Sequence, residues 1–337
     1  MTGSVTLSLG EAERLAHDAL AACGTRADNA RATAAALVRA EADGQAGHGL
    51  SRVPSYAAQA KVGKVKGDAV PVMHRVAEAT LRIDAGLGFA YPAIDMAIDA
   101  LAALAPRTGI AAASIYRSHH FGQAGAHAER LAERGLVALL FGNSPKAIAF
   151  WGGKRPMLGT NPIAFAAPLP ASQPPLVIDL ALSKVARGKI MAAGKAGKTI
   201  PEGWALDTNG KPTTDPAAAM AGSMLPIGDA KGAALAMMVE ILAAALTGSH
   251  FGWEASSLFD AEGAPPDLGQ TLIVIDPGLF SAGRFLERMA AFCAAVEAEN
   301  GARLPGLSRL ERRKRAARDG IAIPAALERE IRALIAA

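Results

Sequence analysis

The sequence predicts an α/β fold with a central sheet and helices built from both ends of the chain. The chain has 337 residues, of which 51% are hydrophobic and 20% charged, so a large core is available. Short apolar runs bounded by Gly, Pro, Asn or Asp fill the middle of the chain and alternate with helical patterns. Alanine-rich segments with helical periodicity precede and follow this middle part.

The first helices are predicted from their start signals. Ser8 and Glu11 have the spacing of a capping box, and apolar residues follow them at helical intervals. A similar signal at residues 25–28 precedes an alanine-rich helix that reaches about Asp43. A third helical stretch should run to residue 63, with Pro54 in or near its first turn.

The middle and the end of the chain complete the predicted layout. Strands are expected at residues 79–84, 110–116, 137–142, 163–167, 176–182 and 271–275. Helices are expected at residues 92–104, 124–134, 184–193 and 231–246, then from 283 to 300, with two more after the break at residues 304–306. Residues 1–78 with 283–337 should therefore form a helical domain, and residues 79–282 an α/β domain inserted into it.

Composition excludes several classes of protein. The net charge is +4, and much of it lies in the run 309–315, which is typical of a solvated helix face or of a contact to an anionic cofactor. No aromatic residues interleave with the run, so we expect no nucleic-acid partner. No signal peptide and no membrane-spanning stretch are expected, and Cys23 and Cys293 look like buried thiols of a cytoplasmic protein.

The familiar nucleotide-binding motifs are missing from the sequence. There is no G-x-G-x-x-G and no Walker A motif, and Gly86-Leu87-Gly88 lacks the third glycine. Either the protein binds no dinucleotide, or it binds one through an unrelated architecture.

His48 and Arg52 are the first candidates for chemistry. They are four residues apart, so on a helix they would share a face. An imidazole beside a guanidinium suits a substrate with a carboxylate next to a reducible C=O or C=N group, because Arg holds the carboxylate and His exchanges the proton. The simpler alternative is a surface pair at a helix start.

Three further segments combine small and polar residues. His119 and His120 would point to opposite faces of a strand, so we expect no metal site there, and the glycines that follow favour a loop that contacts phosphate. Thr160 lies in a turn before a strand, and Asp179 lies inside an apolar strand, where an unpaired carboxylate would be costly. The segment 228–232 is either an anion site or an ordinary helix cap.

Taken together, these segments resemble the malate/L-lactate dehydrogenase type 2 family of NAD(P)H-dependent oxidoreductases, whose fold is not a Rossmann fold. The matching motifs are Gly47-His48-Gly49 with Arg52 and Tyr56, residues 118–122, 159–164, 201–205, 212–216, Lys231-Gly232 and Leu304-Pro305-Gly306. The double histidine and residues 237–254 are similar to one branch of the family, the Δ1-piperideine-2-carboxylate/Δ1-pyrroline-2-carboxylate reductases.

The resemblance implies a role for each matched position. His48 would be the proton donor, and Lys189 would occupy a second catalytic position. The substrate would contact Arg52, Thr160, Arg187 and Gly188. NADPH, with NADH as the alternative, would contact His120, Phe121, Gly122, Gln123, Ala124, Ile178, Asp179, Leu180, Ala230, Lys231, Pro305, Gly306, Leu307, Ser308 and Arg309. From its charge, we expect Arg309 to meet a 2′-phosphate.

The implied activity is reduction of cyclic imino acids to L-proline or L-pipecolate by a homodimer. Two departures keep alternatives open: Gly47 stands where the family usually has Ser, and Lys189 stands where the imine reductases carry Asp. The first alternative is a 2-hydroxy acid dehydrogenase of the malate or lactate type. The second is a binding or regulatory protein that holds the cofactor without turnover.

Overall fold

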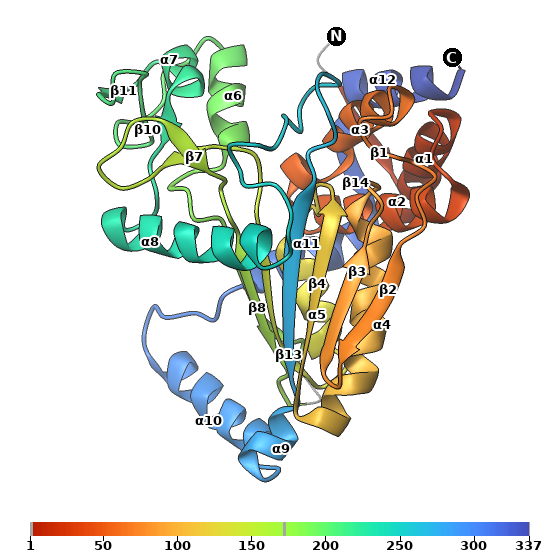
Figure 1. Cartoon of the computed structure of the whole chain (residues 1–337), viewed down its shortest axis with the longest axis vertical. Helices are drawn as coiled ribbons and strands as arrows, with labels where there is room; N and C mark the ends of the chain where they lie inside the picture. The colour runs from red at the N-terminus through yellow and green to blue at the C-terminus, as the bar shows by residue number, and fades with distance from the viewer. Residues whose placement is uncertain (1–2, 171–172, 337) are drawn as a thin grey trace.

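The computed structural model describes residues 3–170 and 173–336 and has a seven-stranded sheet at its centre (Figure 1). Across the sheet the strands are β2 (Val72–Ala77), β3 (Thr80–Asp84), β4 (Ile110–Ser118), β13 (Leu268–Ile275), β5 (Val137–Gly142), β8 (Ile163–Ala167) and β9 (Leu176–Leu180). Only the β3–β4 pair is parallel among these neighbours. The predicted α/β class is confirmed, as are all six predicted strands, whereas β2 was not predicted because its residues show no alternation of buried and exposed positions.

The two faces of the sheet are covered by different helices. Alternate residues of a strand point to opposite faces, and on β5 Ala138 and Leu140 pack with α4 (Ala90–Thr108) and α5 (Ala124–Ala132). Leu139 and Phe141 belong instead to the core beside α8 (Asp229–Glu240) and the π-helical turn η3 (Ile241–Ala245) that continues it. The single helix predicted for residues 231–246 is therefore an α-helix followed by a π-helical turn.

Both ends of the described chain contribute to one helical unit. It contains α1 (Leu9–Ala22), α2 (Ala27–Ala42), α3 (Val53–Lys61), α11 (Leu307–Asp319) and α12 (Ala325–Ala336). The strands β1 (Ser4–Leu7) and β14 (Ile321–Pro324) pair antiparallel and join these segments, and one apolar core runs through them. The capping box of Ser8 and Glu11 is confirmed, but the start signal at residues 25–28 is not, because the N-cap is Arg26 and its side chain makes no capping bond.

A smaller lobe stands at one end of the sheet, at the upper left of Figure 1. It holds α6 (Arg187–Lys195), α7 (Pro216–Ala221) and a five-stranded sheet of β11 (Pro212–Thr213), β10 (Ala205–Leu206), β12 (Ser223–Met224), β6 (Ile148–Ala149) and β7 (Pro156–Leu158). These strands have two or three residues each, too few for a periodic pattern to reveal them. At the opposite end, α9 (Pro277–Ser281) and α10 (Phe285–Ala298) reach away from the body.

One edge of the central sheet collects the ends of several strands. β4 and β5 both run antiparallel to β13, so Ser118 and Gly142 lie at the same edge. β8 starts there, since Ile163 pairs with Phe141, and β9 ends there, since Leu180 pairs with Ile163. The topology therefore brings the predicted site segments after β4, before β8 and at the end of β9 together. Within residues 3–170 and 173–336, no helix combines the length and apolarity needed to cross a bilayer.

Candidate functional site

His48 and Arg52 lie on two short 3-10 turns, η1 (Ala46–His48) and η2 (Leu50–Arg52), and not on the single helix expected from their spacing. Glu41 of α2 holds the junction, because its carboxylate accepts a hydrogen bond from the N–H of Leu50 at 2.8 Å. A Cβ on Gly49 would overlap the Glu41 carboxylate, so a larger residue there would displace this side chain from the junction.

The imidazole of His48 stacks on that of His120, with ring centroids 5.3 Å apart and planes 21° apart. Nδ1 of His120 lies 2.5 Å from the hydroxyl of Tyr56, which lies 3.1 Å from the hydroxyl of Tyr91. Two predicted residues from distant segments thus meet at the sheet edge. Tyr91 was missed, because nothing in the sequence distinguishes it from an ordinary core tyrosine.

Burial decides the charge of these groups. Desolvation, assisted by the nearby Arg52 guanidinium, lowers the pKa of His48 to about 4 and holds the pKa of His120 well below its usual value. Desolvation also raises the pKa of Tyr56 to about 12. Near pH 7 both imidazoles are therefore neutral. Nδ1 of His48 is buried and has no hydrogen-bond partner among the described residues.

The turn that carries Thr160 is fixed from two sides. Oγ of Ser144 accepts a hydrogen bond from the Thr160 N–H at 3.0 Å and lies 3.2 Å from the Thr160 hydroxyl. Asn161 adopts a left-handed backbone with φ of 40°, and its side-chain amide donates to Glu240 at 2.7 Å and to the carbonyl of Ala236 at 2.8 Å. The turn is thereby tied to α8.

Glu240 organises the surroundings of this turn, and sequence reasoning missed it. Its buried carboxylate accepts hydrogen bonds from the N–H of Gly252 at 2.6 Å and from the side chain of Asn143 at 3.3 Å, besides Asn161. A glutamate inside an otherwise apolar helix was the available signal, because such a carboxylate needs partners.

Asp179 lies at the end of β9 and has the partner that its burial requires. One of its carboxylate oxygens accepts the N–H of Gly125, in the first turn of α5, at 2.8 Å. Desolvation raises the pKa of this carboxyl. A turn lies alongside β9, since a Cβ on its Gly306 would be 3.5 Å from the carbonyl oxygen of Val177 in that strand. This turn consists of Pro305, Gly306, Leu307, Ser308 and Arg309. The structure thus brings together the predicted segments around Gln123 and Ala124, Ile178 to Leu180, and Pro305 to Arg309.

Arg309 is not a solvated cation. Its side chain is 10% exposed, and its guanidinium donates to both carboxylate oxygens of Glu129, at 2.7 and 3.1 Å. Arg313 donates to Glu129 and to Asp43, whose side chain is fully buried. The prediction of a solvated face for the run 309–315 is therefore wrong for these two arginines. Their carboxylate partners lie on distant helices, which a local pattern cannot reveal.

Two groups of predicted residues lie at the starts of helices α6 and α8. Arg187 at the start of α6 donates to the carbonyl of Lys146 at 2.9 Å, and burial lowers its pKa. Gly188 and Lys189 follow it and are exposed. Ala230 and Lys231 are exposed in the first turn of α8.

Phe121 and Gly122 lie in the loop that follows the double histidine. Phe121 is buried beside Gly142, where a Cβ would overlap the Phe121 ring. Gly122 has a φ of 67°, and a Cβ on it would overlap the Tyr91 hydroxyl.

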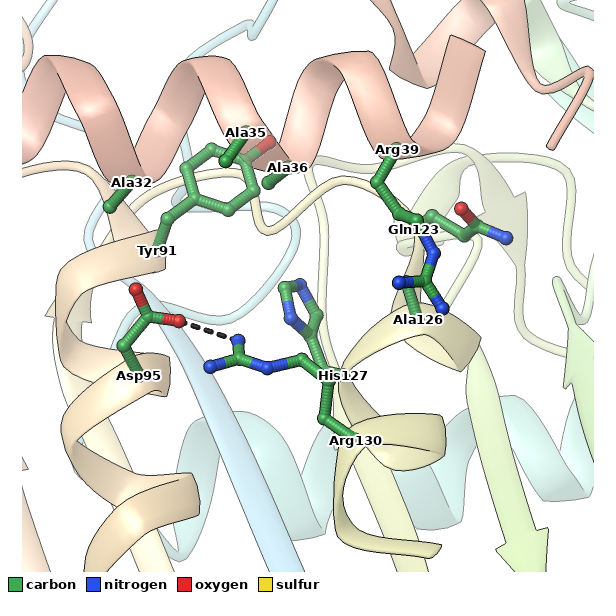
Figure 2. A pocket seen from close by; sticks show the side chains of 10 residues that line it. All are labelled: Ala32, Ala35, Ala36, Arg39, Tyr91, Asp95, Gln123, Ala126, His127 and Arg130. Atoms are coloured by element: carbon green, nitrogen blue, oxygen red, sulfur yellow. Dashed lines mark hydrogen bonds and ion pairs between the residues drawn. The ribbon is translucent and has the colours of Figure 1, made fainter. Parts of the chain in front are cut away.

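A separate cavity of about 220 Å³ lies between α2, α4 and α5 (Figure 2). Asp95 and Arg130 face each other across it, 2.5 Å apart. Its other arginine, Arg39, contacts Glu129 at 2.6 Å. His48, Arg52 and His120 do not line this cavity, and the charged side chains that do line it, Arg39, Asp95 and Arg130, each take part in an ion pair.

Comparison with known proteins identifies the family. Residues 7–332 match the model of the malate/L-lactate dehydrogenase family. The chain belongs to the malate/L-lactate dehydrogenase family. This member is similar to the structure of Δ1-piperideine-2-carboxylate reductase from Pseudomonas syringae, with a TM-score of 0.92 and 38% identity over 98% of this chain and 99% of that one. The resemblance seen in the sequence and its non-Rossmann dehydrogenase fold are confirmed.

Relatives of this malate/L-lactate dehydrogenase family member act on more than one kind of substrate. The present chain is 54% identical to a (2R)-3-sulfolactate dehydrogenase (NADP(+)) of Chromohalobacter salexigens, over 97% of both chains. It is 42% identical to a Δ1-pyrroline-2-carboxylate reductase of Ancylobacter novellus, over 99% of this chain and 98% of the relative. Both relatives are named as oxidoreductases, whereas the substrates in their names differ.

Proposed function

We propose that this protein interconverts a 2-hydroxy acid and the corresponding 2-oxo acid with NADP(H), and that its substrate carries a second acidic group, as 3-sulfolactate does. The observation that carries the proposal is the neutral, buried imidazole of His48 beside the Arg52 guanidinium. The relative at 54% identity supports this substrate class over cyclic imines.

The chemistry of Arg52 and His48 suggests which step of the reaction each side chain carries out. The guanidinium of Arg52 binds the substrate carboxylate, which places the neighbouring carbon beside His48. The neutral imidazole of His48 accepts the hydroxyl proton during oxidation and returns it to the carbonyl oxygen during reduction. The bound nicotinamide cofactor supplies the hydride acceptor or donor. A substrate carboxylate on Arg52 offsets the positive charge that disfavours the protonated imidazole, so substrate binding prepares His48 for the reductive direction.

The segments at the sheet edge fit a nicotinamide dinucleotide. The Asp179 carboxylate has a second oxygen available for a ribose hydroxyl, and the close approach of Gly125 and Gly306 to β9 brings α5 and the turn at residues 305–309 beside this carboxylate. His120, Phe121, Gly122, Gln123, Ala124, Ile178, Leu180, Pro305, Leu307 and Ser308 would complete this surface. Arg309 is held by Glu129, so a 2′-phosphate would need another cation such as Lys231. Titration with NADPH and NADH in parallel tests this part.

One departure from the imine reductases, Lys189, also favours a substrate with a second acidic group. Lys189 brings a cation where those enzymes are expected to carry a carboxylate, and a cation attracts an anionic substrate tail. Arg187, Gly188 and Lys189 lie at the start of α6. Thr160 would complete the substrate surface with its hydroxyl.

Reduction of Δ1-pyrroline-2-carboxylate or Δ1-piperideine-2-carboxylate is the second candidate. It is supported by the relative at 42% identity and by the similarity to the Pseudomonas syringae structure. In this reaction His48 would protonate the ring nitrogen. The absence of a serine hydroxyl at Gly47 weakens this candidate, because the imidazole lacks that partner.

Parallel steady-state assays separate the candidates. Purified protein is assayed by NADPH absorbance with sulfopyruvate, pyruvate, oxaloacetate and the two cyclic imines, and in the other direction with 3-sulfolactate and malate. We expect the highest kcat/KM for an oxo acid with a second acidic group. A higher kcat/KM for either imine contradicts the first proposal, and cofactor binding without any turnover indicates a binding protein.

We also propose that the protein is a homodimer. Several apolar side chains of α8 and the turn after it are 39–62% exposed, which is unusual for an isolated chain. They are Leu235, Met237, Met238, Ile241 and Leu246. Light scattering coupled to size-exclusion chromatography should give twice the chain mass of 34.5 kDa. Ile241→Glu should lower this mass if the face is the interface.

A further inference from the structure

Arg52 is held so that only one edge of its guanidinium is available. Its Nε donates to the carbonyl of Gly47 at 2.7 Å. The ring of Phe259 covers one face of the guanidinium plane, with the Arg52 Cζ atom 4.7 Å from the ring centroid. No acceptor within residues 3–170 and 173–336 contacts its two terminal nitrogens at hydrogen-bond distance, since the side chain bonds there through Nε. Those two nitrogens form the edge that takes a carboxylate bidentately.

The segment that carries Phe259 is anchored on both sides of the ring. Nζ of Lys64 donates to the carbonyls of Ser257 at 2.7 Å and Asp260 at 3.1 Å, and the Lys64 side chain is completely buried. Nε2 of Gln59 donates to the carbonyl of Leu258 at 3.1 Å. Phe259 itself is 42% exposed, so these hydrogen bonds, and not core packing, hold the backbone that carries its ring.

Gln59 also connects this segment to the double histidine. Its Oε1 accepts a hydrogen bond from Nε2 of His119 at 2.7 Å. Gln270 of β13 in turn donates to the His119 carbonyl at 3.2 Å. The Phe259 segment is thereby fixed relative to α3, which follows Arg52, and to the loop that carries His120.

We propose that Phe259 is a positioning residue that sets the carboxylate-binding edge of Arg52. The ring blocks rotation of the guanidinium toward solvent and displaces water from one of its faces. Both effects strengthen a carboxylate contact. The inference rests on the proposed role of Arg52 in substrate binding. It does not depend on whether the reacting group is a carbonyl or an imine.

Two readouts test Phe259 independently. The first is calorimetric titration with oxamate, which has a carboxylate beside a carbonyl, in the presence of saturating NADPH. The second is steady-state kinetics with the best substrate. For Phe259→Ala we expect oxamate affinity to fall and KM to rise by about 10-fold, the size of a partly shielded cation–π contact, while kcat stays within about 3-fold. Phe259→Tyr keeps the ring and should restore both values.

Phe280→Ala, which removes an exposed phenylalanine from α9, is the matched control and should change neither value. Unchanged oxamate affinity in Phe259→Ala would overturn the inference, as would a loss of kcat at constant KM. If the wild type turns over none of the acids or imines, the proposed function fails. The oxamate titration then still decides whether Phe259 acts on Arg52. Equal losses in the Ala and Tyr variants would show that the ring is not the active feature.

Discussion

The side-chain amide of Gln123 donates to the carboxylate of Asp43 at 2.9 Å, in a buried contact between the loop after the double histidine and the end of α2. Asp43 directly precedes the turns that carry His48 and Arg52. Its other oxygen accepts from Arg313, and Arg309 lies 3.4 Å away. The loop after the double histidine and the turns that carry His48 and Arg52 are therefore both connected to one buried carboxylate.

Asp43→Asn should destabilise the protein by about 3 kcal/mol, because it leaves two largely buried guanidinium groups short of negative charge. Chemical denaturation monitored by fluorescence measures this change. Glu133→Gln is the control. It removes an exposed carboxylate 3.8 Å from Arg39 and should cost less than about 1 kcal/mol. If both variants lower the free energy of unfolding equally, the buried contacts of Asp43 do not contribute to stability.

His48→Asn should lower kcat by about 100-fold or more while NADPH affinity stays within about 2-fold, because the variant loses only the proton acceptor. The pKa of His48 is about 4 in the free protein, so kcat/KM for oxidation should stay constant as the pH falls from 8 to 5. Stopped-flow absorbance at several pH values measures both. Full activity in His48→Asn would refute the assigned role.

Stability should fall as the pH drops below 6.5. Burial lowers the pKa of His48 and His127 to about 4 and that of His119 to about 3, and holds His120 well below its usual value. Between these values and 6.5 the unfolded chain binds more protons than the folded one, so each histidine contributes a slope of about 1.4 kcal/mol per pH unit.

Urea denaturation between pH 7.5 and 5 gives this slope. Replacing His127 by Asn should make it shallower by about 1.4 kcal/mol per pH unit. A free energy of unfolding that stays constant over this range would mean that the imidazoles are not buried as the structure has them.

The double variant Gly47→Ser with Lys189→Asp should raise kcat/KM for cyclic imines relative to oxo acids by at least about 10-fold, because it restores the two polar groups expected in imine reductases. A Cβ on Gly47 has no neighbour within 4 Å, so the serine fits. Lys195→Asp, at the exposed end of the same helix, controls for charge alone. An unchanged ratio would remove these two positions from the explanation of substrate choice.

Glu240→Gln should lower the free energy of unfolding by about 2 kcal/mol. The reason is that the amide NH2 of Gln then faces a buried donor, either the N–H of Gly252 or the side chain of Asn161. Since Asn161 fixes the Thr160 turn, KM should rise as well. Glu254→Gln, at an exposed site where the side chain accepts only from the Phe251 N–H among residues 3–170 and 173–336, should change stability by less than about 1 kcal/mol. A neutral Glu240→Gln variant would mean that the turn is held without this carboxylate.

The regular elements were predictable where signals are local. The capping box of Ser8 and the apolar runs bounded by turn residues each depend on a few neighbouring positions, and the structure has the elements they predict. The two- and three-residue strands of the small lobe and the π-helical turn after Glu240 depend on partners far along the chain. No window of sequence contains the information that places them.

The same distinction applies to the candidate site. His48, Arg52 and His120 stood out because their residue types and flanking glycines are unusual within short segments. Asp43, Tyr91 and Phe259 did not, because each acts through a contact with a residue at least 35 positions away, as Tyr91 does with Tyr56. Arg309 illustrates the converse case, since a charge visible in the sequence is neutralised by Glu129 on another helix.

The pairing of β1 with β14 has a consequence for synthesis on the ribosome. The core that supports the His48 turns includes Ile321, Ile323 and Ile331 as well as residues of α1 and α2. This unit therefore cannot close during translation until residues beyond 331 have left the exit tunnel, whereas the strands of the central sheet up to β13 are already available. A nascent chain should acquire its sheet first and the complete turn that carries His48 last.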